Sequence, residues 1–340
     1  MPQLRSTPDV LVKLWLYCIA ALVFCMVIVG GATRLTDSGL SITEWKPLLG
    51  AIPPLGEADW AAAFQKYTHI PEYQIQNRGM SLDDFKFIYW WEWTHRFLGR
   101  FIGIAFAVPL IYFAITGTLE RRLCNRLVAL LILGGAQGGL GWYMVSSGLA
   151  DRVDVSQYRL AAHLTLAAII FAAIVWVALG INKNRRKPSS SSQWFAVSLI
   201  VLVLFQTAAG GFVAGLDAGM GYATWPLMDG QWAPNGLWMM TPGWINLFEN
   251  AMTVQFNHRM LAYAIAAATI FHAWKVGTIQ SFILAAAVLA QACLGILTLL
   301  LGVPLAIALA HQAGAMLVLA IAIWNLHHGL LIQSPVPDQR

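Results

Sequence analysis

Four histidines at corresponding places in the two halves of this 340-residue chain are the residues best suited to chemistry. His95 and His163 lie in the first half and His258 and His311 in the second, each within a long apolar segment. An ionisable side chain is costly inside a membrane and therefore usually has a function there. Imidazole is a common axial ligand, and a six-coordinate haem iron takes two. The pairs predict two haem sites, or one site and a relic of another. The alternative is that these histidines only bond to carbonyls inside a helix bundle.

The sequence around these histidines also repeats. Thr94-His95-Arg96-Phe97-Leu98 resembles Asn257-His258-Arg259-Met260-Leu261. Further matches keep a constant offset of 180 or 154 residues: Gly30-Gly31 with Gly210-Gly211, Asp37, Gly39 and Trp45 with Asp217, Gly219 and Trp225, and Gln137 and Gly141 with Gln291 and Gly295. The chain therefore contains two related halves.

The composition indicates an integral membrane protein. Hydrophobic residues make up 58% of the chain and charged residues 11%, whereas soluble domains carry about 25% charged residues. The apolar runs have the length of membrane helices, so membrane lipid is the expected surrounding. The net charge of +5 comes from basic residues concentrated in short connections, where they set topology, and no nucleic acid partner is expected. All four cysteines lie in predicted helices or at a helix end, so no disulfide is expected in the long loops.

Charge in the connections predicts the orientation of eight membrane spans. The spans are expected at residues 12–33, 88–116, 124–146, 158–181, 194–216, 252–274, 279–301 and 305–331. The connection 217–251 has no Lys or Arg, and the basic residues of 34–87 are outweighed by seven acids. The positive-inside rule therefore places both termini in the cytoplasm and these two connections outside. The first apolar run lacks a small-residue cleavage site, which favours an uncleaved first helix in a bacterial inner membrane, with a processed organellar chain as the alternative.

Four helices in each half predict an all-α integral membrane protein made of two pseudo-symmetric four-helix bundles. The expected units are an N-terminal half at 1–182, a cytoplasmic linker at 183–193 and a C-terminal half at 194–340. All four histidines lie early in even-numbered spans, which run from outside to inside. Both sites are therefore expected toward the periplasmic side, with the long outer connections as lids.

Glu92 is the main difference between the halves. It precedes His95 by three residues, on the same helical face, and the corresponding position in the second half is Gln255. A carboxylate here moves protons or stabilises a cationic intermediate. Alternatively, it orients an imidazole or a neighbouring arginine. The spacing favours neither role over the other.

Three arginines near the histidines are candidates for binding haem propionates or supporting the ligands. Arg96 and Arg259 directly follow histidines, and Arg34 ends the first span. A guanidinium matches a carboxylate bidentately, whereas contact with lipid headgroups is the alternative. The remaining histidines are His69 in the outer loop and His272, His327 and His328 at cytoplasmic helix ends. They are interpreted as residues that snorkel to the interface or pair with a helix dipole.

Several segments strongly resemble the haem A synthases, over nearly the whole chain. They are Gly30-Gly31-Ala32-Thr33-Arg34-Leu35-Thr36-Asp37-Ser38-Gly39-Leu40-Ser41 with Trp45-Lys46-Pro47, Glu92-Trp93-Thr94-His95-Arg96, Ala162-His163, Phe256-Asn257-His258-Arg259 and His311-Gln312. Some members carry a cysteine pair in each long outer loop, and this chain has none. It is similar to the cysteine-free branch with alphaproteobacterial and mitochondrial members.

The resemblance implies an activity and assigns roles. It implies oxidation of the C8 methyl of haem O to a formyl group, for cytochrome oxidase assembly. It implies a haem b cofactor on His258 and His311, a substrate haem on His95 and His163, and an essential catalytic role for Glu92. A hydrophobic intermediate makes homo-oligomers and a complex with haem O synthase plausible partnerships, although no residue specifies either.

Two other functions stay open on the residues alone. A bis-histidine b-type membrane cytochrome would only pass electrons, for example from quinol. A haem exporter or carrier would use the two related halves for alternating access. The haems extracted with the protein discriminate between these classes, because only the synthase is expected to carry haem O or haem A beside haem B.

Overall fold

The computed structural model describes residues 7–46, 49–150, 152–181, 187–188 and 190–331. Its regular elements within those ranges are helices, with one isolated bridge between Met228 and Gln231. The termini at 1–6 and 332–340 and part of the expected linker at 183–193 lie outside the described residues. The all-helical class expected from the apolar runs is confirmed for the described part of the chain.

The helices of 22 residues or more follow the expected spans to within six residues at each end. They are α1 (Thr7–Leu35), α4 (Leu82–Ile115), α5 (Arg121–Val145), α6 (Gln157–Gly180), α7 (Ser191–Gly215), α10 (Ala251–Val276), α11 (Ile279–Leu300) and α12 (Leu305–Gly329). Among the described residues, seven of them are long and apolar enough to cross a membrane, and α10 is not one of the seven. Helix α10 carries polar groups along its length, including Gln255, His258, Arg259, His272 and Lys275.

Helix α4 begins six residues before the expected span because a polar cap, not an apolar run, defines its start. Ser81 Oγ accepts a hydrogen bond from the backbone N–H of Asp84 at 3.1 Å, and the Asp84 carboxylate accepts the Ser81 backbone N–H. This reciprocal arrangement is a capping box, which satisfies backbone donors that a helix start leaves open. The first turns of α4 therefore precede the apolar part of the helix.

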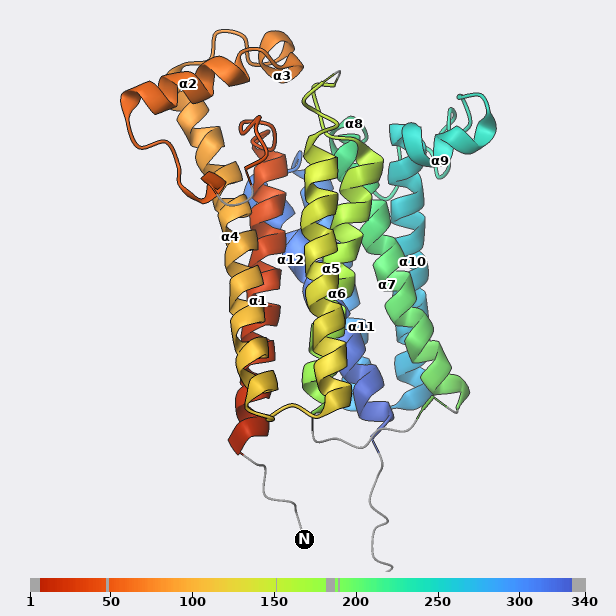
Figure 1. Ribbon diagram of the computed structural model, residues 1–340. Helices are drawn as coiled ribbons and strands as arrows, with labels where there is room; N and C mark the ends of the chain where they lie inside the picture. Colours follow the sequence, from red (N-terminus) through yellow and green to blue (C-terminus); the bar gives the residue numbers. More distant parts are fainter. Residues whose placement is uncertain (1–6, 47–48, 151, 182–186, 189, 332–340) are drawn as a thin grey trace, which may run out of the picture.

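The long helices run side by side (Figure 1). In the first half, α1 and α5 each pack against α4 and α6; in the second half, α7 and α11 each pack against α10 and α12. The halves meet where α6 contacts α7 and α12, and where α1 contacts α12. These contacts place α1, α6, α7 and α12 at the centre of the molecule.

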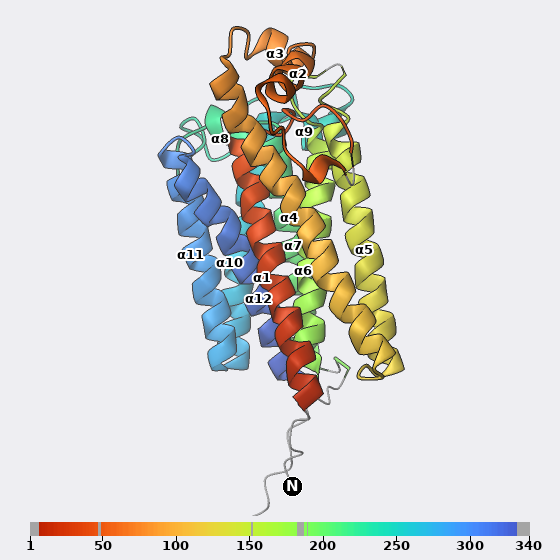
Figure 2. The same ribbon diagram turned by 60° about the vertical axis from the view of Figure 1, so that its left-hand side comes forward.

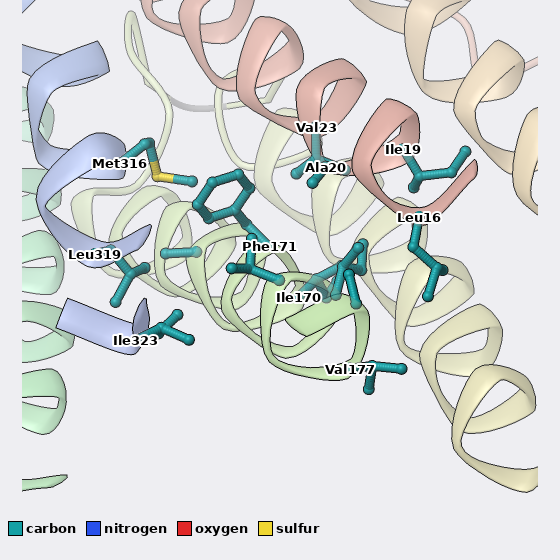
Figure 3. Close-up of a cluster of buried hydrophobic side chains, with 14 of the residues drawn as sticks. Leu16, Ile19, Ala20, Val23, Ile170, Phe171, Val177, Met316, Leu319 and Ile323 are labelled. Carbon is teal, nitrogen blue, oxygen red and sulfur yellow. The ribbon is translucent and has the colours of Figure 1, made fainter. Parts of the chain in front are cut away.

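A cluster of apolar side chains fills the contact between α1, α6 and α12 (Figure 3). Leu16, Ile174 and Leu319 are at most 2% exposed. Lipid tails are as apolar as these side chains, so close van der Waals packing rather than transfer out of water holds such helices together. Tight packing here fixes the helices that carry the candidate ligands.

Both long connections lie at the end of the molecule opposite the start of α1 (Figures 1 and 2). The first contains the short helices η1 (Leu49–Ala51), α2 (Glu57–Tyr67) and α3 (Pro71–Ile75). Tyr67 and Phe85 are fully buried between these elements and the start of α4. The second connection contains α8 (Ala218–Gly221), η2 (Gly243–Ile245) and α9 (Asn246–Glu249). The two connections therefore lie on one side, as the lid interpretation requires.

Candidate functional site

Each of the four candidate histidines lies against a glycine on the preceding long helix. A Cβ added to any of these glycines would lie within 3.3 Å of the facing imidazole. The pairs are Gly30 with His95 (3.0 Å), Gly141 with His163 (2.9 Å), Gly210 with His258 (3.3 Å) and Gly295 with His311 (2.8 Å). Contacts this close exclude any side chain from these positions without displacement of the ring. The repeated glycines are thus the places where the helices admit an imidazole.

The structure brings the histidines together in the expected pairs. Helices α4 and α6, which carry His95 and His163, both pack against α1 and α5, and helices α10 and α12, which carry His258 and His311, both pack against α7 and α11. All four side chains are half-buried. Among the described residues, no group of three or more His, Cys, Asp and Glu side chains is placed to hold a bare metal ion. The arrangement is two pairs of imidazoles, which matches a metal whose other ligands come from a macrocycle.

The second glycine of each repeated Gly-Gly pair contacts a helix of the other half instead of a histidine. A Cβ on Gly31 would overlap the side chain of Gln312 on α12, whose amide donates to the Val27 carbonyl at 2.9 Å. A Cβ on Gly211 would lie 2.7 Å from the Cα of Ala161 on α6. The Gly-Gly pairs therefore serve two contacts each, one with a histidine of the same half and one with a helix of the other half.

Glutamine amides contact three of the four histidines. Gln137 reaches His163, Gln206 reaches His258 and Gln291 reaches His311, with the amide nitrogen 2.6–3.0 Å from the histidine carbonyl oxygen. The sequence repeat pointed to Gln137 and Gln291 but missed Gln206. The signal was present, because all three stand four residues before a glycine that faces a histidine.

Glu92 is buried, at 2% exposed, and fastens the first outer loop to α4. One carboxylate oxygen accepts from Ser41 Oγ and from the Ile42 backbone N–H, both at 2.7 Å. The other accepts from Arg96, at 3.0 Å from Nε and 2.6 Å from Nη2. Arg96 in turn donates to the carbonyl oxygens of Ile42 and Glu44. Both oxygens of Glu92 are therefore engaged by protein groups, which favours the orienting alternative of the two open roles.

Gln255 and Arg259 repeat this arrangement in the second half, but here the Gln255 side chain donates to the loop instead of accepting from it. Arg259 donates to Gln255 Oε1 at 2.9 Å and to the carbonyl oxygens of Tyr222 and Thr224. The Gln255 amide donates to the carbonyl oxygen of Ala218 at 2.7 Å. The loop therefore offers an acceptor where the first loop offers donors. This explains a glutamine here and a glutamate there.

Arg34 joins the two halves at their outer ends. It forms ion pairs with Asp37 at 2.9 Å, with Asp154 at 3.4 Å and with Asp217 at 2.8 Å. Asp217 belongs to the second half, so the pair crosses the boundary between the halves. All three arginines proposed for propionates thus have protein partners that hold loops in place.

The remaining histidines separate into two kinds. His69 and His328 are in the outer loop and at an exposed helix end, as expected. Snorkelling to the interface is wrong for His272 and His327, which are 4% and 5% exposed, whereas His327 does lie in the last turn of α12, where pairing with the helix dipole is expected. His272 stacks on Phe195 and contacts the Asn325 amide at 3.1 Å, so packing between α7, α10 and α12 holds it inside the bundle.

The residues of both pairs fit a haem. The four glycines that face the imidazoles, here called the cradle glycines, let each ring lie against the neighbouring helix. The side-chain oxygens of Gln137, Gln206 and Gln291 are buried without a hydrogen-bond partner, as is Nδ1 of His163. An imidazole that binds iron through one nitrogen presents an N–H on the other, which needs an acceptor. The glutamines that contact the rings each carry an unpartnered amide oxygen, which is an acceptor of the kind that such an N–H needs.

The sequence matches the family described as cytochrome oxidase assembly protein, COX15-CtaA, over residues 13–323. The chain belongs to this family. Similar curated proteins named heme A synthase include those of Parvibaculum lavamentivorans, 54% identical over 92% of both chains, and Azorhizobium caulinodans, 56% identical over 92% of both chains. That of Chelativorans sp. is 54% identical over 94% of this chain and 91% of its own length. The family match includes both histidine pairs and both outer loops.

Proposed function

We propose that this protein is a haem A synthase that oxidises the C8 methyl group of haem O to a formyl group, producing haem A for cytochrome oxidase assembly. The match to proteins of that name over both halves of the chain carries this proposal. The unlike surroundings of two otherwise related histidine pairs also support it, because a synthase needs one site that reacts and one that does not.

The proposed architecture is eight spans in two four-helix bundles. Helix α10 is the eighth span: it packs between α7 and α11 and carries His258 at the position that His95 has on α4. Its polar residues have protein partners, such as Gln206 for His258 and Asn325 for His272. The units are 1–182 and 194–340, joined by the linker 183–193. Each half holds one histidine pair.

The proposed location is a bacterial inner membrane, with both termini in the cytoplasm. The distribution of basic residues supports this orientation, because the second outer connection has none. With that orientation, both histidine pairs lie toward the periplasmic side, beneath the loops that Glu92 and Gln255 fasten. Haem O would then enter from the outer half of the bilayer.

The second half is the cofactor site. His258 and His311 would hold haem b, and a haem with two histidine ligands supplies one-electron transfer. Gly210 and Gly295 admit the two rings, and Gln206 and Gln291 contact them. With the neutral Gln255 in place of a carboxylate, this half has no acid beside its ligands on α10. Such a site suits a group that stays bound.

The first half is the substrate site. His95 and His163 would hold the haem O iron, and the loop fastened by Glu92 and Arg96 covers the site. Converting a methyl to a formyl group passes four electrons to an electron acceptor and adds one oxygen atom. Each electron or hydride equivalent that leaves the methyl carbon for that acceptor leaves positive charge beside the macrocycle. We assign Glu92 two contributions: it fixes Arg96 and the loop over the substrate, and its negative charge favours that developing positive charge.

Extracted haems test the proposed function. Purified protein is expected to contain haem B together with haem O or haem A, and to form haem A in cells that make haem O. The matched control is His95→Ala, which leaves the second pair intact and should abolish haem A formation while haem B remains. Haem B alone in the wild-type protein, without haem A formation, would instead support the electron-transfer cytochrome.

A further inference from the structure

One helical turn before each cradle glycine stands a side chain that faces the same helix neighbour. It is a glutamine in three of the four cases and a different residue in the fourth. Residues four apart lie on the same face of a helix, so each of these side chains faces the same histidine as its glycine. Three of them are glutamines: Gln137 before Gly141, Gln206 before Gly210 and Gln291 before Gly295. The fourth, before Gly30, is Met26. His95 is therefore the one candidate ligand of the four without a glutamine at this position.

The three glutamines make the same contact. Each amide nitrogen donates to the backbone carbonyl of its histidine, at 3.0 Å for His163, 3.0 Å for His258 and 2.6 Å for His311. The same nitrogen lies 3.1–3.3 Å from a nitrogen of the imidazole ring. One amide thus spans the backbone and the ring of a single residue, and this fixes the rotation of the ring relative to its helix.

The amide oxygens of the three glutamines suggest a role for them once haem is bound. All three oxygens are buried and have no hydrogen-bond partner. An unsatisfied buried acceptor is costly and is expected to have a partner in the functional state. Iron binding through one ring nitrogen leaves an N–H on the other, and a neighbouring acceptor then fixes the tautomer and increases the basicity of the ligand. The amide nitrogen faces the ring in this structure, so rotation of the amide about its last bond would present the oxygen to that N–H.

Met26 offers no equivalent group. Its methyl carbon would lie 3.2 Å from a Cβ on Gly99, one turn after His95 on α4, so the side chain lies beside that ligand. A thioether sulfur is only a weak acceptor and has no donor. At the position where the other three histidines have a glutamine, His95 therefore has a flexible apolar side chain and no amide.

We propose that Gln137, Gln206 and Gln291 are positioning residues that hold their histidines as fixed haem ligands, and that His95, which has Met26 at the corresponding position, is the exchangeable ligand of the substrate haem. This inference rests on the proposed function. It gives the second half two held ligands, as a resident cofactor requires. It gives the first half one held and one loose ligand, as a site that must take up haem O and release haem A requires.

Three substitutions test this inference by replacing glutamine with methionine in the second half and methionine with glutamine in the first. Gln206→Met and Gln291→Met place a thioether in the second half, and Met26→Gln places an amide beside His95. Gln280→Met, in the first turn of α11 and 11 residues before Gln291, is the matched control. The readouts are the midpoint potential of haem B in the purified protein, its electron paramagnetic resonance signal, and the rate at which each haem transfers to apomyoglobin.

The expected results have opposite signs in the two halves. Gln206→Met and Gln291→Met should raise the haem B potential, because loss of the acceptor weakens electron donation by the ligand, and haem B should leave about 10-fold faster or more. Met26→Gln should slow the loss of haem O and haem A by a similar factor and lower turnover without changing haem B. Gln280→Met should match the wild type in every readout.

Failure of this inference is distinguishable from failure of the proposed function. Wild-type protein that binds no haem O or haem A would overturn the proposed function. Wild-type protein that makes haem A, with unchanged haem B potential and release in Gln206→Met and Gln291→Met, would overturn the positioning role. Unchanged release of haem O and haem A in Met26→Gln would overturn the assignment of His95 as the exchangeable ligand.

Discussion

Arg96 donates two hydrogen bonds to Glu92, one turn earlier on α4, and through this pair the first outer loop is fastened over the first histidine pair. Arg259 and Gln255 repeat the contact on α10. The two loops differ in what they present: Ser41 and Ile42 donate to the acid, whereas Ala218 accepts from the amide. Each side chain therefore matches the polarity of its own loop, and the two are not interchangeable.

Glu92→Gln is expected to block haem A formation and to leave haem B bound. A single amide oxygen cannot accept from Ser41, Ile42 and Arg96 together, and the amide N–H groups would face donors. Loosening the loop over the substrate misplaces it, and a displacement of about 1 Å can cost on the order of 100-fold in rate. Haem A formed per haem B present measures the effect; normal haem A output from this variant would refute the role of Glu92.

Gln255→Glu is the reciprocal change and should act on the other half. Its carboxylate would face the carbonyl oxygen of Ala218, an acceptor opposite an acceptor, although it would still pair with Arg259. The second outer loop should loosen, so protease cleavage within 217–245 should rise and haem B content should fall. Cleavage and haem B content equal to the wild type would show that loop polarity does not determine this position.

Much of this organisation was readable from the sequence, because lipid imposes long apolar runs and internal repeats expose paired positions. The helix bounds and the pairing of the histidines followed from these two signals. The start of α4 did not, because the capping box at Ser81 and Asp84 extends the helix beyond its apolar run.

Contacts between helices were harder to predict than helices. Gln206 escaped notice because its counterpart at an offset of 180 residues is Met26, so a search for identical residues passes over it. The burial of His272 was also missed: its place near a helix end suggested the interface, but Phe195 and Asn325 from neighbouring helices enclose it. Partners contributed by other helices decide such cases.

Replacing a cradle glycine by alanine adds one methyl group, which should reduce haem binding only in the half where that glycine lies. Gly141→Ala and Gly295→Ala each place a Cβ within 2.9 Å of an imidazole carbon, too close without displacement of His163 or His311. Gly141→Ala should reduce haem O and haem A binding, and Gly295→Ala should reduce haem B binding, each measured as haem per purified protein.

Gly134→Ala is the matched control for these variants. It lies on α5 like Gly141, but a Cβ there meets nothing within 4 Å. Alanine in a helix interior is more favourable than glycine by about 1 kcal/mol, so this variant should bind haem normally and be no less stable. Equal haem binding by Gly141→Ala and Gly134→Ala would contradict the cradle.

Removing the positive charge of Arg34 should destabilise the contact between the two halves at the end where the long connections lie. Arg34→Gln leaves Asp37, Asp154 and Asp217 close together without a positive charge. The acids are partly exposed, so the loss is expected to be modest, about 1 kcal/mol, and smaller at high salt because salt screens the repulsion. Thermal unfolding at two salt concentrations measures it. Adding Asp217→Asn should recover part of the loss, and no recovery would argue against the cross-half ion pair.

Glu72 predicts a pH-dependent first outer loop. Burial raises the pKa of this carboxyl to about 8; the hydrogen bond from Tyr67 opposes the shift, and the charges of Glu92, Asp37 and Asp154 add to it. The folded pKa lies above the ordinary value of 4.5, so the folded loop favours the neutral acid. The stability of the loop is therefore greatest below about pH 4.5 and is lost as pH rises toward 8. Each pKa unit corresponds to about 1.4 kcal/mol, which makes the loss on the order of a few kcal/mol.

Hydrogen exchange in α2 and α3 between pH 5 and pH 8.5, corrected for the intrinsic effect of pH, measures this loss. The wild-type loop should lose protection as pH rises, whereas Glu72→Gln, which keeps a neutral side chain, should keep it. Glu57→Gln changes an exposed acid in the same loop and should behave like the wild type, because an exposed carboxylate stays hydrated in both states. Equal pH dependence in Glu72→Gln and the wild type would show that another group controls the loop.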